Sequence, residues 1–208
     1  MGMIKKDLLM IKNNRKSIII AFVLYIMYSI MFEIDMSFFL TIMGLMMCVS
    51  TLNYDDFNNW HIYAGSLPQG RINVVKSKYI TSIIVTSIFT ILGEMMGLLI
   101  SFTKGNYNLE NMISSGIGGL IASIFIMSIL YPIVFKYGAE KGRIAITILG
   151  VGIVGVCMLF TSFINIDAST KLIDSLDIYF PVICIIGSIL MISISYIISK
   201  KVYLKREF

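Results

Sequence analysis

The sequence contains few of the side chains that usually build catalytic or metal-binding sites. Its 208 residues include one His and three Cys, and they show no His, Cys, Asp and Glu spacing typical of metal ligands. Intramembrane metalloproteases and hydrolases need convergent ligands or nucleophiles. The sequence therefore favours a protein that is not an enzyme and that has no metal site.

The three cysteines, Cys48, Cys157 and Cys184, lie inside apolar runs. Disulfide pairing is not expected there, and the spacing is not that of a metal site. A free cysteine in such a setting behaves as a small hydrophobic side chain. We interpret all three as packing residues.

The sequence also lacks a nucleotide-binding loop. The pattern G-x-x-x-x-G-K-[ST] supplies the backbone amides and the Lys that surround the phosphates of ATP. The nearest approach, GSLPQGRI at 65–72, has Arg71 and Ile72 where Lys and Ser or Thr belong. We therefore expect no cofactor in this chain, and ATP could drive it only through another polypeptide.

Charged residues are scarce. They make up 14% of the chain, against about 25% in soluble domains, while 57% of the residues are hydrophobic and the mean hydropathy is +0.87. No Pro-, Gly- or Ser-rich linker divides the sequence. These features predict one membrane domain that covers residues 1–208.

The apolar residues form six runs, each near the roughly 20 residues that a helix needs to cross a bilayer. The runs are continuous rather than alternating, which favours helices over barrel strands. The predicted fold is all-α and integral to the membrane. Its six transmembrane helices are expected at 17–32, 37–52, 79–102, 112–135, 144–166 and 178–199.

The basic residues give an independent test of this count. With six spans, Lys104 and Lys171 are the only two of the 17 Lys and Arg that fall on the opposite side from the rest. By the positive-inside rule, both termini are then cytoplasmic. The net charge of +5 thus reflects topology, and because no nucleic-acid motif accompanies it, we expect no nucleic-acid partner.

Residues 1–16 are predicted to form an interfacial helix. Apolar residues share one face and lysines gather toward another, as expected of a helix that lies on anionic headgroups. The alternative is a simple positively charged anchor. The two sets are Ile4, Leu8 and Ile11, and Lys5, Lys12 and Lys16.

The loop at 53–78, between the second and third predicted spans, is rich in polar and aromatic residues. Asp55 or Asp56 can cap a short helix, because a carboxylate accepts the free amides of the first turn. Gly65 permits a left-handed stop, and Pro68 prevents continuation. The residues that recur at helical spacing and predict one aromatic face are Phe57, Trp60, His61 and Ala64.

An aromatic face on a short helix has two interpretations. Such side chains fill pockets on a partner protein, or they lie at the headgroup level as an aromatic belt. After the turn, Arg71 begins a helical pattern that runs through Lys76 and Lys78 into the third predicted span.

The order of residues in this loop resembles the corresponding loop of permease subunits of ABC-2-type transporters. The resemblance lies in an acid and aromatic segment followed by Ser66-Leu67-Pro68, Arg71, Val74-Val75 and Ser77-Lys78-Tyr79. It covers about 25 residues closely, and the rest of the chain through the six-span plan. The small half-size exporters of the bacteriocin-immunity and phenol-soluble-modulin kinds are the most similar members.

The resemblance implies that this loop is a cytoplasmic coupling helix that docks on a separate ABC ATPase subunit, which binds ATP and Mg. It further implies an elbow helix at 1–16, a short outer helix at 165–177, a second permease (identical or a sister), and a bacterial-type cell membrane. The exported substrate would be an amphipathic peptide or a lipid-like molecule. The implied docking and turn residues are Asp55, Asp56, Phe57, Asn59, Trp60, Tyr63, Leu67, Pro68 and Arg71.

Glu94 is the one plainly internal ionisable residue of the predicted spans. A carboxylate in the bilayer costs on the order of 3 kcal/mol, so it should face protein or water. Gly93 and Gly97 give the small-xxx-small spacing that lets two helices approach closely. Glu94 therefore lines a substrate or proton path, or it makes one polar contact at a packed interface.

Two other functional classes stay open from the sequence. A proton-linked secondary transporter or channel could use Glu94, although no second buried charge and no duplication of three-span halves is visible. A non-transporting immunity or scaffold protein could use the 53–78 loop for recruitment alone.

Overall fold

The computed structural model describes residues 2–32, 36–67, 70–104, 109–138, 141–142, 144, 148 and 180–205. The described part is helical, as predicted. Most of the fifth predicted span and the proposed outer helix at 165–177 lie outside the described residues. The helices are α1 (Gly2–Asn13), α2 (Arg15–Phe32), α3 (Met36–Phe57), α4 (Trp60–Ser66), α5 (Gly70–Lys104), α6 (Leu109–Tyr137) and α9 (Phe180–Lys205).

Three of the described helices are long and apolar enough to cross a membrane. They contain the segments Gly70–Leu99, Ile113–Tyr137 and Ile183–Lys205, which coincide with the third, fourth and sixth predicted spans. Helices α2 and α3 occupy the places of the first two predicted spans. That α2 and α3 also cross the membrane stays a prediction.

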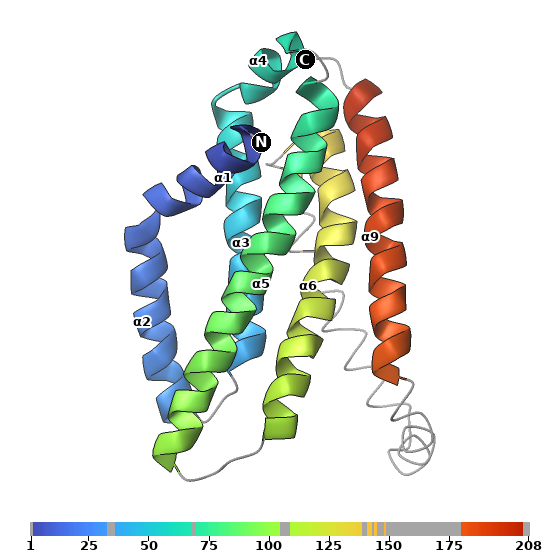
Figure 1. Cartoon of the computed structure of the whole chain (residues 1–208). Coiled ribbons are helices and arrows are strands. Elements are labelled where there is room, and N and C mark those ends of the chain that lie inside the picture. The colour runs from blue at the N-terminus through green and yellow to red at the C-terminus, as the bar shows by residue number, and fades with distance from the viewer. Residues whose placement is uncertain are drawn as a thin grey trace.

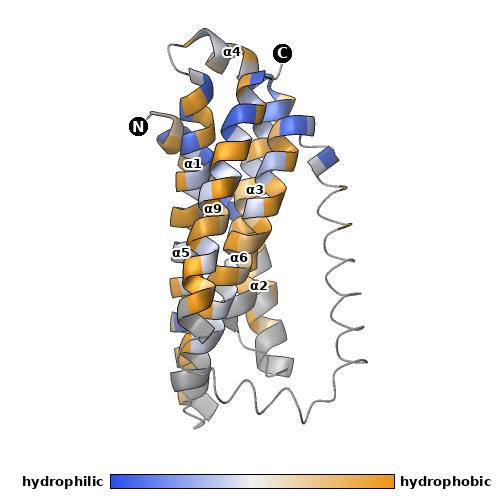
Figure 2. Ribbon diagram, turned by 90° about the vertical axis from the view of Figure 1, so that its right-hand side faces the viewer, coloured by the Kyte–Doolittle hydropathy of each residue, from blue (hydrophilic) through white to orange (hydrophobic). Residues whose placement is uncertain are grey.

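Helices α2, α3, α5, α6 and α9 run along a common axis, while α1 is inclined to it and α4 caps one end (Figure 1). The N and C markers lie at the same end as α4. Hydrophilic residues gather at the end that carries α4, and hydrophobic residues dominate the rest of the described bundle (Figure 2). We call the end with α4 the basic end, after its exposed lysines Lys5, Lys12, Lys76, Lys136, Lys141, Lys201 and Lys205.

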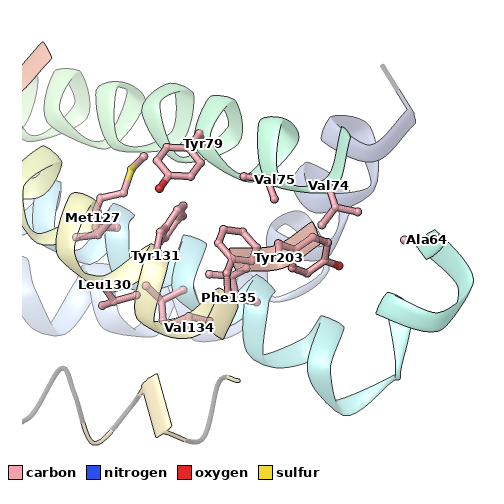
Figure 3. Close-up of a cluster of buried hydrophobic side chains, with 13 residues drawn as sticks. Ala64, Val74, Val75, Tyr79, Met127, Leu130, Tyr131, Val134, Phe135 and Tyr203 are labelled. Atoms are coloured by element: carbon pink, nitrogen blue, oxygen red, sulfur yellow. The ribbon is translucent and has the colours of Figure 1, made fainter. Parts of the chain in front are cut away.

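The larger buried cluster lies toward the basic end and joins α3, α4, α5, α6 and α9 (Figure 3). Tyr79 of α5 faces Tyr131 of α6 edge-on, with ring centroids 5.0 Å apart. The Tyr79 hydroxyl shares hydrogen bonds with Ser195 at 2.6 Å and Ser199 at 2.8 Å on α9. Because a buried phenol needs a polar partner, these bonds fix the register between α5 and α9.

Helix α3 packs closely against α5 along the shaft. A Cβ on Gly44 would lie 2.9 Å from Cβ of Phe89, so this crossing needs a glycine. One turn away, the hydroxyls of Thr41 and Thr90 are 2.8 Å apart and share a hydrogen bond. These contacts hold the two helices that enter and leave α4.

Candidate functional site

The short helix predicted in the 53–78 loop exists as α4, but it begins later than expected. Asp55 and Asp56 belong to the last turn of α3, which runs to Phe57. The N-cap residue is Asn59, with φ 51° and ψ 32° and without a side-chain cap bond. The prediction that an aspartate caps this helix is therefore wrong, because Asn tolerates the left-handed conformation that separates the two helices.

The predicted single aromatic face is also wrong. Phe57 ends α3 and is 85% exposed, whereas Ala64 of α4 is fully buried. Trp60 is half-buried, and its ring lies 5.0 Å from that of Tyr63. The left-handed residue at Asn59 rotates α4 relative to α3, so residues spaced for one helix are divided between two.

Helix α4 ends at Ser66 rather than at Gly65, which lies inside the helix. Leu67 follows in an extended conformation, with φ −82° and ψ 143°. The glycine that this turn requires is Gly70, because a Cβ there would lie 1.8 Å from the carbonyl oxygen of Ala64. Pro68 lies outside the described residues.

A buried group of four charges lies beside α4. Lys78 of α5 places Nζ 2.9 Å from Oδ1 of Asp7 and 2.6 Å from Oδ2 of Asp55. Lys6 Nζ lies 2.6 Å from Asp55 Oδ1 and 3.3 Å from Asp7 Oδ1. We call Lys6, Asp7, Asp55 and Lys78 the ion cluster.

The ion cluster is electrically balanced and mostly dry. Two lysines oppose two aspartates, and Asp7, Asp55 and Lys78 are 1%, 3% and 2% exposed. Lys78 also donates to Thr51 Oγ1 at 3.0 Å. Because burying an unpaired charge is costly, these contacts explain how a helix of this apolar bundle accommodates Lys78.

The ion cluster changes the role that the sequence suggested for Asp55. Its carboxylate faces Lys6 and Lys78 of the same chain and is turned away from solvent. A side chain in this position does not offer its charge to another protein. Lys6, Asp7 and Lys78 are not predictable as partners from the sequence, since their contacts join residues far apart along the chain.

The surface of α4 and of the end of α3 is apolar and aromatic. Phe57 is 85% exposed, Ile62 64% and Tyr63 56%. Asp56, by contrast, is half-buried. We call this surface the α4 patch, and it consists of Tyr54, Phe57, Ile62, Tyr63 and Leu67.

The structure brings three of the residues implied by the resemblance, Phe57, Tyr63 and Leu67, into the α4 patch. Tyr54 was not singled out from the sequence because it precedes the predicted cap at Asp55 or Asp56, and Ile62 because it does not fit the spacing of the predicted face. Arg71 lies outside the patch, and its guanidinium donates to the backbone oxygen of Leu204 at 3.3 Å. Arg71 thus ties the start of α5 to the end of α9.

Glu94 lies at the contact between α5 and α6. A Cβ on Gly116 would lie 2.2 Å from Glu94 Oε1, so the carboxylate occupies the space that Gly116 leaves open. This oxygen is buried and has no hydrogen-bond partner among the described residues. Of the two predicted packing glycines, Gly93 is buried and Gly97 half-buried, but the close approach seen at Glu94 involves Gly116.

The cysteines lie as packing residues where the structure describes them. Cys48 is buried and Cys184 half-buried, and both are free thiols. Cys157 lies outside the described residues.

Residues 2–204 match the family model described as ABC-2 family transporter protein. The chain belongs to this family. Searches of curated proteins and of solved structures gave no match. As an ABC-2 family member with membrane-spanning helices, the chain is an integral membrane permease subunit of an ABC transporter, and the family implies that it works with an ABC ATPase subunit.

Proposed function

We propose that this ABC-2 permease is the membrane subunit of an exporter, and that its ATPase subunit docks on the α4 patch. The exposure of five apolar and aromatic side chains around α4 carries this proposal. Large apolar side chains at a polar end of a membrane protein mark a surface that a partner covers. Aromatic residues are also the commonest energetic centres of protein interfaces.

The orientation of the molecule supports cytoplasmic docking. The exposed lysines Lys5, Lys76, Lys136 and Lys201 share the end that carries α4. Positive charges are retained on the cytoplasmic side. We therefore place the basic end, both termini and the α4 patch in the cytoplasm, where an ATPase subunit with its ATP and Mg is found.

The path from the α4 patch to the membrane is short. Helix α5 begins at Gly70, four residues after the end of α4, and continues as one helix for 35 residues to Lys104. The Gly70 amide donates to the Leu67 oxygen at 2.9 Å. A displacement of α4 would thus be transmitted to α5, which is one continuous helix that reaches the other end of the bundle.

The proposed assembly has two permeases, identical or sister chains, and two ATPase subunits. The proposed substrate is an amphipathic peptide, such as a peptide toxin or antimicrobial peptide, because of the likeness of the 53–78 loop to the small half-size exporters. The proposed location is a bacterial-type cell membrane, with lipid around the exposed apolar faces of α5 and α9.

Copurification in mild detergent tests the docking. The variant Phe57→Ala/Ile62→Ala/Tyr63→Ala removes three exposed side chains of the α4 patch. Interface centres cost about 2 kcal/mol or more when truncated, so the affinity for the ATPase subunit should fall at least about tenfold. The matched control is Leu204→Ala, which shortens an exposed apolar side chain at the same end but outside the patch.

Retention of the ATPase subunit is compared between permease samples that are all shown to be folded. Loss of an ATP-hydrolysing partner from the triple variant, with a monodisperse permease and a normal control, supports docking at the patch. Equal retention of that partner by the triple variant refutes it. Export is tested in proteoliposomes that contain the complex, with a fluorescent amphipathic helical peptide as the probe, and it should require ATP.

Glu94 supports a second candidate, a proton-linked transporter or channel, because its Oε1 is buried without a partner among the described residues. This candidate predicts that the peptide moves in response to a proton gradient without ATP, and that Glu94→Gln abolishes the movement. Retention of an ATPase subunit without any transport would instead favour the immunity or scaffold role.

A further inference from the structure

The ion cluster connects α1 to the two helices that flank α4. Lys6 and Asp7 come from α1, Asp55 from the last turn of α3, and Lys78 from the third turn of α5. Each lysine contacts one aspartate on α1 and one on α3. None of these three helices can move away from the other two without separating opposite charges.

Buried ion pairs restrain motion in a way that apolar packing does not. Apolar contacts are non-directional, so helices can slide while they keep most of the buried area. Separating a buried pair leaves two uncompensated charges in a medium of low dielectric, which is far more costly. The cluster thus fixes the position of α1 along α3 and α5.

Helix α1 is also tied to α4 itself. The ammonium group of Lys6 lies 4.2 Å from the centre of the Trp60 ring, within the range of a cation–π contact. Met3 and Trp60 pack against the same buried cluster, which includes Ala64. Helix α4 therefore packs on α3 and α5, and the Lys6–Trp60 contact ties it to α1, while the α4 patch stays exposed.

At its other end, α1 is joined to α2 by the single residue Asn14. The Asn14 amide donates to the oxygens of Met10 and Ile11, and the Asn14 oxygen accepts from Ile18. The backbone hydrogen bonds thus continue through the joint. Because the connection is a single hydrogen-bonded residue, α1 cannot move without displacing the start of α2.

We infer that Lys6, Asp7, Asp55 and Lys78 are positioning residues that make α1 and α4 one rigid unit, so that a displacement of α4 is passed to α2 as well as to α5. This inference rests on the proposed function for the origin of the force at α4. The ATPase subunit would then move two helices of the permease, one directly and one through α1.

The test uses a variant in which the three buried members of the ion cluster are replaced by apolar side chains, Asp7→Leu/Asp55→Leu/Lys78→Met, while the partly exposed Lys6 is kept. Replacing all the buried charges of an ion group is often neutral or stabilising, whereas removing one buried partner is not. The variant should therefore fold. The control, Lys5→Met/Lys76→Met, changes exposed lysines on the same two helices, α1 and α5.

The first measurement concerns the permease alone, in detergent. Spin labels at Lys12→Cys on α1 and Ser66→Cys on α4, in a background without the three native cysteines, report the distance between these helices. The distribution should be narrow in the wild type and in the control, and clearly broader in the apolar variant. An equally narrow distribution in the apolar variant would overturn the inference.

The second measurement concerns the complex with its ATPase subunit. Labels at Ile20→Cys on α2 and Ile186→Cys on α9, both exposed side chains, follow α2 with and without ATP. The wild type should show an ATP-dependent shift that is lost in the apolar variant, although its ATPase subunit stays bound. A shift of equal size in the apolar variant would also overturn the inference. If no ATPase subunit binds the wild type, the proposed function fails, while the first measurement still decides whether the cluster is rigid.

Discussion

The two places where the described bundle buries carboxylates differ in how those carboxylates are compensated. At the basic end, Asp7 and Asp55 lie 2.6 to 3.3 Å from the nitrogens of two lysines. At the α5–α6 contact, no lysine or arginine among the described residues pairs with Glu94, and its buried Oε1 packs against Gly116. The first place joins three helices through charge, and the second joins two through shape.

This difference indicates which contacts can change during a transport cycle. Charges that are paired in several directions resist separation, because each broken pair leaves a charge without compensation. A carboxylate that gains no bond from its neighbour loses little when the neighbour moves. We therefore expect the basic end to move as a unit and the α5–α6 contact near Glu94 to adjust.

Removal of Lys78 should have the largest effect. In Lys78→Met, Asp7 and Asp55 both lose their buried partner and keep only the partly exposed Lys6, so the free energy of unfolding should fall by about 3–5 kcal/mol. Thermal unfolding in detergent, followed by size-exclusion chromatography, measures the loss.

The control for Lys78 is Lys76→Met, two residues away on the same helix and exposed. Its effect should stay within about 0.5 kcal/mol. If both variants are equally stable, the buried charges do not hold the basic end together.

Gly70→Ala should have the next largest effect. Its new Cβ would lie 1.8 Å from the Ala64 oxygen, a backbone atom that moves only if α4 moves. Overpacking of this kind costs about 1–3 kcal/mol, and we expect the upper part of that range, together with weaker retention of the ATPase subunit. In the control Gly65→Ala, the nearest atom would be the Arg71 side chain at 3.8 Å, which is an ordinary contact. Equal behaviour of the two variants would contradict the close approach of α4 to α5.

The architecture was predictable because it depends on patterns within short windows. Continuous apolar runs gave the positions of α5, α6 and α9, and the acid and aromatic residues after 52 indicated a short helix in the loop. These signals need no knowledge of distant residues. The exact start of α4 was not predictable from capping rules. Asp55 pairs with Lys6 and Lys78 instead of capping α4, and the left-handed conformation of Asn59 separates α3 from α4.

The ion cluster itself was beyond the reach of sequence patterns. Lys78 and Asp7 are 71 residues apart and Lys6 and Asp55 are 49 apart, and no periodicity connects them. From the sequence, Asp7 and Lys78 look like ordinary charges near a membrane surface. Their pairing follows from the way α1 folds back onto the start of α5, which depends on the whole bundle.

Gly116→Ala tests the fit between α5 and α6. The added Cβ would lie 2.2 Å from Glu94 Oε1, but this atom ends a flexible side chain and can move. The loss of stability should therefore lie near the lower end of the about 1–3 kcal/mol range of overpacking. The control Gly118→Ala places its Cβ in open space, and combining Gly116→Ala with Glu94→Ala should restore the stability lost through the clash. No rescue in the double variant would mean that the clash is not with Glu94.

The smallest effect is expected from Glu94→Gln, and it compares the two places by one chemical change. The same replacement of a carboxylate by an amide at Asp7 removes a buried partner of Lys78 and should cost about 3 kcal/mol. At Glu94 no bond is lost, so stability should not fall and should rise by at most about 1 kcal/mol. Side-by-side thermal unfolding of Asp7→Asn and Glu94→Gln measures both. A loss at Glu94 as large as that at Asp7 would show that Glu94 has a strong partner in the assembled transporter. Both carboxylates would then be paired, Asp7 within its own chain and Glu94 with another chain, and the proposed contrast between the two places would be wrong.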